Sequence, residues 1–409
     1  MRILHTSDWH LGQRLVNLER TEEHQHFLDW LLQTIETEKV EVLLMAGDVF
    51  DTGAPSNTAL KQYYNFLTRV CNTCCRHIIL IGGNHDSVST LNAPKELLDC
   101  FNIKVIGGAT SNYLDELIEL HNKQGKLELV VCAVPFLRDR DIRLSVAGET
   151  YEERETRLKE GIASHYAQFA PHLQPYKAQH VPLIAMGHLF AAGGTASESE
   201  KEIHVGNLGQ IGAAQFPKEF DYVALGHLHR PQKVNNASHI RYSGSPIPLS
   251  FSEVTDKKVV FILDFEAGKL TNLREVDIPV CRKLIRFKGP LEKVKQQISV
   301  YDNSSYTLPA WVEIQVELDA LLPDLTQQLD EVLQLKKDEL QLLIHRPPIL
   351  KTTRQPLEQQ VYEEADLHTL QEKEVFLKRC ESAFPESDHT ELVASFNELL
   401  ELMRQEVES

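Results

Sequence analysis

Five short apolar runs in this chain end in side chains that bind metals or transfer protons. Each run has the length and aliphatic content of a buried strand, and Asp, Asn or His follows within a few residues. Because chemistry in α/β proteins gathers at the carboxyl ends of parallel strands, we expect the chain to fold so that these five ends meet. In chain order the motifs are Asp8-x-His10, Gly47-Asp48-x-x-Asp51, Gly83-Asn84-His85-Asp86, Gly187-His188 and Gly226-His227-x-His229.

Strand patterns alternate with helix patterns from Arg2 to about Pro279. The strands expected at 2–6, 42–46 and 77–81 are apolar throughout, which is typical of sheets that helices cover on both sides. Helices are expected at 23–38 and from Pro55 to Val70, where apolar residues recur at helical spacing. The sequence therefore predicts an α/β fold with a layered core in residues 1–279.

The pattern restarts after about Val280, which predicts a second, smaller α/β domain at 280–350. A chain of 409 residues is also long for a single core. Arg346-Pro347-Pro348 is expected to end the last strand of this domain, and a polar linker is expected at 351–368. The strands predicted in this domain are 283–288, 311–317 and 340–345, and its helices are 291–298 and 325–333.

Residues 369–409 are expected to form two helices. Thr369 with Glu372, and Asp388 with Glu391, have the form of capping boxes. An apolar stripe at helical spacing follows the second box. It packs either on the body of the same chain or on a partner protein, and the sequence leaves both alternatives open. The residues of the stripe are Leu392, Val393, Phe396, Leu399, Leu400 and Met403.

The net charge of −17 argues against nucleic-acid binding only if it is spread evenly. Residues 361–409 hold thirteen Asp and Glu against four Lys and Arg, a net of −9 that leaves −8 for the preceding 360 residues. No apolar run reaches the roughly eighteen residues of a membrane span, and strand-like residues 2–6 occupy the position of a signal peptide. Seven irregularly spaced cysteines do not indicate a disulfide framework. We therefore expect a cytoplasmic protein with no membrane association.

Asp, Asn and His together form an oxygen and nitrogen ligand set that suits Mn²⁺, Fe or Zn²⁺ in open coordination. The five motifs supply more ligands than one ion needs, and a carboxylate such as Asp48 can bridge two ions. Two ions about 3.5–4 Å apart can activate a water molecule and hold a phosphate for in-line displacement. The sequence therefore predicts a phosphoester hydrolase.

In their order and spacing the motifs resemble those of the calcineurin-like metallophosphoesterases. More narrowly, the chain is similar to the SbcD family of bacterial nuclease subunits, which are related to archaeal and eukaryotic repair nucleases. The resemblance implies an αββα core, a small capping domain and a C-terminal helical pair. The segments that carry it are ILHTSDWHLG at 3–12, GDVFDTG at 47–53, PFLRDRD at 135–141 and YSGSPIP at 242–248.

Carried over by position, the resemblance implies two divalent ions, with Mn²⁺ the expected metal. His85 would stabilise the phosphate and assist the leaving oxygen. Asp86 would either orient His85 or have a structural role in the turn. Archaeal and eukaryotic relatives have a histidine where Asp51 stands, so the role of Asp51 beyond a carboxylate beside the site stays open. One ion would be held by Asp8, His10, Asp48 and His229, and the other by Asp48, Asn84, His188 and His227.

The resemblance also implies DNA as the substrate, through 3′-to-5′ exonuclease action on duplexes and endonuclease action on single strands and hairpins. Arg138, Arg140 and Arg143 either contact DNA phosphates or form a salt-bridged loop with the interleaved aspartates. The implied partner is an SbcC-type SMC-like ATPase that would receive the C-terminal helices, with a homodimer of this chain inside a heterotetramer. The alternatives are a phosphatase or cyclic-nucleotide phosphodiesterase of the same fold, and a scaffold with a vestigial site.

Overall fold

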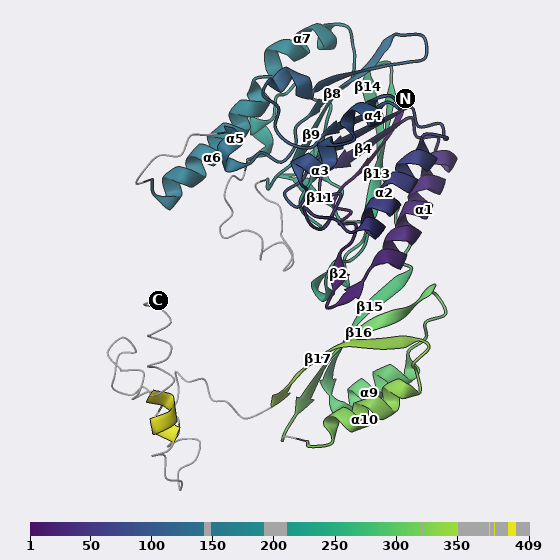
Figure 1. The fold of residues 1–409 in the computed structure, drawn as a ribbon, viewed down its shortest axis with the longest axis vertical. Coiled ribbons are helices and arrows are strands. Elements are labelled where there is room, and N and C mark those ends of the chain that lie inside the picture. The colour runs from purple at the N-terminus through teal and green to yellow at the C-terminus, as the bar shows by residue number, and fades with distance from the viewer. Residues whose placement is uncertain are drawn as a thin grey trace. The chain divides into compact units, whose positions relative to one another are not determined.

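The computed structural model describes two stacked six-stranded sheets and a separate three-stranded sheet (Figure 1). All structural statements below refer to residues 1–142, 149–191, 211–320, 322–350, 376, 380 and 392–397. Within these residues, no helix is both long and apolar enough to cross a membrane.

The first sheet has the strand order β14-β13-β1-β4-β5-β6. Its central strands β1, β4, β5 and β6 are parallel, and β13 and β14 complete it in antiparallel fashion. The strands predicted for β1, β4 and β5 coincide with those observed. The bounds are β1 (Arg2–Thr6), β4 (Val42–Ala46), β5 (His77–Ile81), β6 (Ile103–Ile106), β13 (Val259–Glu266) and β14 (Lys269–Asp277).

The second sheet has the strand order β11-β12-β10-β9-β8-β7. Strands β8, β9, β10 and β12 are parallel, so their carboxyl ends share one edge. The bounds are β7 (Leu117–His121), β8 (Leu127–Ala133), β9 (Leu183–His188), β10 (Tyr222–Gly226), β11 (Gln232–Val234) and β12 (Ala237–Tyr242).

Alternation along the strands produces the layers, because successive side chains point to opposite faces of a sheet. Ile3 and Leu44 pack between the two sheets, whereas Leu4 and Leu43 pack against helices on the outside. Helices α1 (Thr21–Thr37) and α2 (Asn57–Val70) cover the first sheet, and α6 (Tyr151–Ala167) and α7 (Ala170–Ala178) cover the second. The predicted αββα core is therefore confirmed.

Shorter elements connect these layers. They are β2 (Arg14–Leu15), β3 (Leu18–Glu19), α3 (Val88–Asn92), α4 (Lys95–Asp99), α5 (Asp139–Ile142) and the 3₁₀ turns η1 (Tyr113–Glu116), η2 (Ala213–Gln215) and η3 (Phe251–Glu253).

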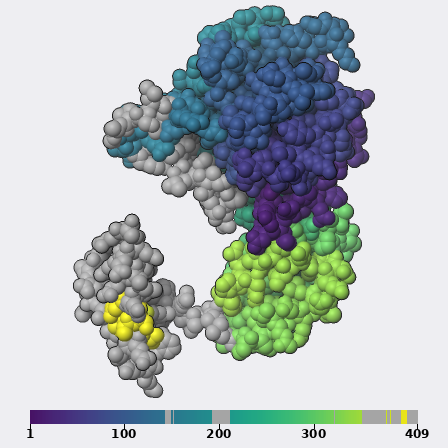
Figure 2. Space-filling view, in the orientation of Figure 1, coloured from purple at the N-terminus to yellow at the C-terminus, as the bar shows by residue number. Residues whose placement is uncertain are grey.

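The third sheet, of order β15-β16-β17, carries two helices and packs beside the N-terminal segment. Figure 2 shows its green atoms next to the purple atoms of that segment. Arg282 pairs with Glu22 at 3.0 Å and Glu23 at 3.1 Å, and its guanidinium lies 4.4 Å from the centre of the Trp311 ring. The bounds are β15 (Arg282–Pro290), α9 (Leu291–Val300), β16 (Leu308–Leu318), α10 (Leu325–Gln334) and β17 (Leu340–Leu350).

The prediction that Arg346-Pro347-Pro348 ends the last strand is wrong. Strand β17 continues through these residues to Leu350. Because β17 is the edge strand of its sheet, one side of it carries no ladder, and prolines are tolerated there. The domain boundary at 279/280 stays a prediction.

The predicted linker and most of the C-terminal helical pair lie outside the described residues, as do Leu399, Leu400 and Met403. Residues 392–397 are helical, with Leu392 exposed and Val393 and Phe396 half-buried. The rings of Phe376 and Phe396 stack with 4.0 Å between their centres. The helical pair and its partner therefore stay predictions.

Candidate metal centre

The five strand-end motifs meet where the carboxyl ends of the two sheets come together. Among the predicted ligands, Asn84 is half-buried and the others are almost completely inaccessible to solvent. Two sets of ligand atoms lie within 4.8 Å of one another, so each can surround a single ion. These sets are Asp8 with His10 and His229, and Asp8 with Asp48 and His188.

Unusual backbone conformations aim several of these side chains. Asp8, His10 and Asp48 have φ values of 51°, 47° and 50°, in the left-handed region that costs free energy for residues with a Cβ. Backbone hydrogen bonds hold the two loops in this form, from Asp8 N to Gly47 O and from His10 N to Asp48 O, both at 3.0 Å. The strain is therefore supported by a ladder between the loops after β1 and β4.

Glycines in the motifs permit close approach between the loops. A Cβ on Gly83 would lie 2.1 Å from Asp48 Oδ1, and one on Gly47 would lie 2.3 Å from His188 Nδ1. Gly47 also has a φ of +87°, which side chains rarely adopt. Any larger residue would push ligand loops apart, which explains why glycine precedes these ligands.

The environment of His188 fits a cation. Its Nδ1 donates to the Ala46 carbonyl at 2.9 Å, which leaves Nε2 as the unprotonated nitrogen of the neutral ring. That Nε2 faces Asn84 Oδ1 at 2.9 Å and Asp48 Oδ2 at 3.2 Å. Three lone-pair atoms this close repel one another unless a proton or a metal ion lies among them.

The acidity of His188 reflects the same arrangement. Burial alone lowers its pKa, but the Asp48 carboxylate outweighs this effect and raises the pKa of His188 to about 9. Burial also acts on Asp48, yet the imidazoles around it hold the pKa of that carboxyl below its usual range. A divalent ion can take the place of the His188 proton because the ligand atoms already converge on it.

His10 shows the same fit from the other side of Asp48. Its two ring nitrogens are buried and make no aligned hydrogen bond, although Nε2 lies 3.6 Å from Asp48 Oδ2 and Nδ1 lies 3.3 Å from Asp51 Oδ1. Burial lowers the pKa of His10, but contact with Asp51 and the charge of Asp48 raise it to about 9. Nitrogens left in this state are suited to metal ligation.

His227 and Asn84 complete the second set of ligands. His227 Nδ1 lies 3.1 Å from Asn84 Oδ1, so this amide oxygen faces ring nitrogens of both His188 and His227. The backbone N–H of His227 donates to Asp8 Oδ1 at 2.9 Å. Asp8 thus links the loop after β1 to the loop after β10.

His85 is oriented by a backbone carbonyl. Its Nδ1 donates to Asp51 O at 2.7 Å, and its backbone N–H donates to Asp48 Oδ1 at 2.9 Å. The His85 ring centre lies 4.7 Å from that of His10. Nε2 is consequently the ring atom of His85 that is available for a substrate.

Asp86 has a different role from orienting His85. Its carboxylate accepts backbone N–H groups of Val49 at 3.1 Å, Phe50 at 3.0 Å and Gly83 at 2.9 Å. Burial and the nearby Asp48 raise the pKa of Asp86 to about 6, against the opposing effect of these three hydrogen bonds. The contacts support the structural alternative, in which Asp86 ties the ligand loops together.

Asp51 is the residue whose role the sequence left open. It lies against both histidines, with its carboxylate near His10 and its carbonyl bound to His85.

The arginines predicted to contact DNA differ in their surroundings. Arg138 Nη2 donates to the Asp86 carbonyl at 3.3 Å, which places this guanidinium beside the His85 turn. Arg140 is exposed and pairs with Asp141 at 3.7 Å, as the salt-bridged alternative predicts. Arg143 lies outside the described residues.

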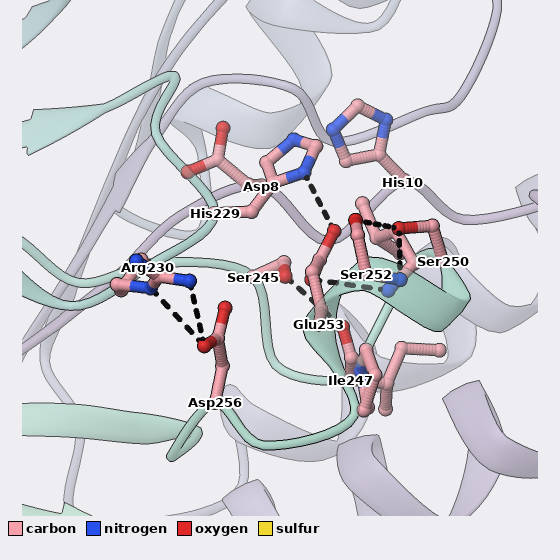
Figure 3. Close-up of polar contacts among 12 residues, drawn as sticks. Asp8, His10, His229, Arg230, Ser245, Ile247, Ser250, Ser252, Glu253 and Asp256 are labelled. Carbon is pink, nitrogen blue, oxygen red and sulfur yellow. Dashed lines mark hydrogen bonds and ion pairs between the residues drawn. The ribbon is translucent and has the colours of Figure 1, made fainter. Parts of the chain in front are cut away.

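Sequence reasoning did not identify Glu253 or Lys258. Both are buried, and Glu253 Oε1 lies 3.4 Å from Nδ1 of the ligand His229 (Figure 3). No motif or spacing marks Glu253, which follows His229 by 24 positions in a polar loop. Only its burial reveals it.

Two family models match the chain. The calcineurin-like phosphoesterase model matches residues 1–231, and the model described as type 5 capsule protein repressor C-terminal domain matches residues 280–384.

Similar curated proteins share a single description, the SbcD subunit of nuclease SbcCD. The one from Escherichia coli (strain K12) is 38% identical over 347 residues, which cover 85% of each chain. The one from Bacillus subtilis (strain 168) is 32% identical over 82% of this chain and 83% of its own length. The one from Rhodobacter capsulatus is 39% identical over 66% of this chain and 67% of its own length.

Proposed function

The chain belongs to the calcineurin-like phosphoesterase family and, within it, to the SbcD subunits of SbcCD nucleases, and we propose that it is the metal-dependent nuclease subunit of an SbcCD-type complex. It acts as a 3′-to-5′ exonuclease on double-stranded DNA and as an endonuclease on single-stranded and hairpin DNA, in DNA repair, recombination and replication. The observation that carries the proposal is the convergence of carboxylate, amide and imidazole ligands beside His85.

Two divalent ions, when bound, supply Lewis-acid chemistry that activates water and neutralises charge on the phosphate. We assign them to the two ligand sets that share Asp48. Mn²⁺ is the proposed metal, because carboxylate, amide and imidazole ligands without thiolates suit it.

The chain's own residues position and protonate the substrate. His85, held through Nδ1, presents Nε2 to the scissile phosphate and gives a proton to the leaving oxygen. Arg138, next to the same turn, contacts a neighbouring phosphate. Arg140 and Arg143 are proposed as weaker DNA contacts.

The proposed partner is an SbcC-type SMC-like ATPase, which binds the apolar stripe of residues 392–403. The description of the relatives as subunits of nuclease SbcCD supports such a complex. The proposed assembly is a heterotetramer that contains a homodimer of this chain, in the cytoplasm. Deletion of residues 360–409 should abolish capture of the ATPase while Mn²⁺ binding persists; capture by the truncated chain would contradict the role of the tail.

A phosphatase or cyclic-nucleotide phosphodiesterase is the alternative with the same metal chemistry. The experiment that separates them incubates the purified chain and Mn²⁺ with end-labelled linear duplex, with and without the partner ATPase. Shortening of the labelled strand supports the nuclease. Rapid hydrolysis of p-nitrophenyl phosphate or cyclic nucleotides with intact DNA in both reactions would refute it.

A further inference from the structure

Glu253 is a carboxylate with no exposed surface, located in η3 at a distance from the five motifs in sequence. Burying a charge is costly unless the group is paired and hydrogen-bonded. Glu253 meets this condition: its Oε2 accepts from Lys258 Nζ at 2.7 Å and from Leu249 N at 3.2 Å. Burial raises the pKa of Glu253, but Lys258 and His229 together bring it below its usual range, so the carboxylate is ionised at neutral pH.

The other oxygen of Glu253 is directed at a metal ligand. Oε1 lies 3.4 Å from His229 Nδ1, and Figure 3 draws this contact with Asp8 and His10 next to the same ring. An ionised carboxylate can only accept, so Nδ1 of His229 carries the proton. Nε2 is then unprotonated, which is the form that a metal ion requires.

Lys258 holds the arrangement from behind. Its Nζ donates to the His229 carbonyl at 3.0 Å and to Ser245 Oγ at 2.8 Å, in addition to Glu253. One buried ammonium thus fixes both the backbone of the ligand and the carboxylate that meets its ring.

The loop that carries Glu253 is also anchored on its far side. Phe251 packs in a cluster with Leu15, Leu284 and Trp311, and Gln13 Nε2 donates to the Leu249 carbonyl at 3.2 Å. These contacts limit how far Glu253 can move when the ion pair is altered.

We infer that Glu253, held by Lys258, is a positioning residue that selects the Nδ1–H tautomer and the ring orientation of His229. The inference rests on the proposed metal centre, in which His229 is a ligand of one ion and not of the other. Loss of Glu253 therefore weakens one of two metal sites.

The test compares Glu253→Gln with the unsubstituted chain. Calorimetric titration with Mn²⁺ should show one site weakened by about 10–100-fold, since second-sphere partners of metal-bound histidines have effects of this size. Nitrogen-15 spectra of histidine-labelled, metal-free protein should show that His229 loses its preference for the Nδ1–H form. Glu266→Gln, at an exposed glutamate, is the matched control and should change neither measurement.

The double variant Glu253→Gln/Lys258→Met guards against misfolding, because it removes both buried charges together. It should show the same loss at one site, and thermal unfolding in EDTA checks that it is folded. Two sites of unchanged affinity in either folded variant, with His229 still in the Nδ1–H form, would overturn the inference. If the unsubstituted chain bound no Mn²⁺, the proposed metal centre would fail, and the tautomer in metal-free protein would still decide the role of Glu253.

Discussion

Replacing Gly83 with alanine should disable the site without unfolding the protein. The added Cβ would lie 2.1 Å from Asp48 Oδ1 and 2.4 Å from Asp48 N. Rotation of the Asp48 side chain relieves the first contact but not the second, which involves backbone. Since non-bonded atoms are best separated by about 3.5–4.0 Å, the two loops must move apart by about 1 Å or more.

The size of the effect follows from what moves. Asp48 belongs to both ligand sets, and its Oδ1 accepts the His85 N–H at 2.9 Å. A misplacement of about 1 Å in a catalytic site costs about 100-fold in rate, which corresponds to about 2.7 kcal/mol of activation free energy. We expect that loss in kcat/KM on labelled duplex DNA, together with weaker binding of both Mn²⁺ ions.

Gly53→Ala is the matched control. A Cβ at Gly53 would meet its nearest neighbour, Ser87 Cβ, at 3.5 Å, which is ordinary contact in the same pair of loops. Both variants should unfold at similar temperatures in EDTA. If Gly83→Ala cleaved DNA and bound Mn²⁺ as well as Gly53→Ala does, the argument that close approach of these loops sets the metal geometry would be refuted.

Three further predictions concern protons and the His85 turn. His10 and His188 have pKa values of about 9 without metal, so Mn²⁺ must displace about two protons at pH 7 and should bind more tightly as pH rises to about 9; calorimetry in buffers of different ionisation enthalpy counts those protons, and binding without release would contradict the ligand assignment. Asp86→Asn should lower the free energy of unfolding by about 1–3 kcal/mol in urea titrations, because its amide N–H₂ would face the Phe50 N–H; an unchanged midpoint and slope would refute the structural role. His85→Gln should reduce cleavage by about 10²–10⁴-fold while metal analysis still finds two ions per chain, and activity near that of the unsubstituted chain would remove His85 from the mechanism.

The motifs were readable in the sequence because their information is local. A strand that ends in Gly-Asp or Gly-His places those side chains at the carboxyl edge of its sheet whatever the remote packing does. The same holds for strand extents: the apolar runs of β1, β4 and β5 define their own bounds. Strand β17 was misjudged because the effect of a proline depends on whether the strand is at an edge, and strand order is not local.

The role of Asp86 could not be settled in this way. Asp86 follows His85 in the chain, yet its carboxylate turns toward the backbone of Val49 and Phe50, and the carbonyl of Asp51 takes the His85 ring. Which of two neighbouring groups reaches a ring depends on how the loops after β4 and β5 pack together. Adjacency in sequence does not predict that packing.

The sequence by itself determined the ligand types, their order, the α/β layers and the family, since each is expressed in short stretches with their own periodicity. Only the tertiary structure decided which atoms converge: the facing lone pairs of His188, Asn84 and Asp48, and the buried carboxylate of Glu253 behind His229. The physical reason is that burial and hydrogen-bond direction arise from contacts between segments far apart in the chain. A glutamate in a polar loop becomes part of a metal centre only when the fold encloses it with Lys258 and a histidine.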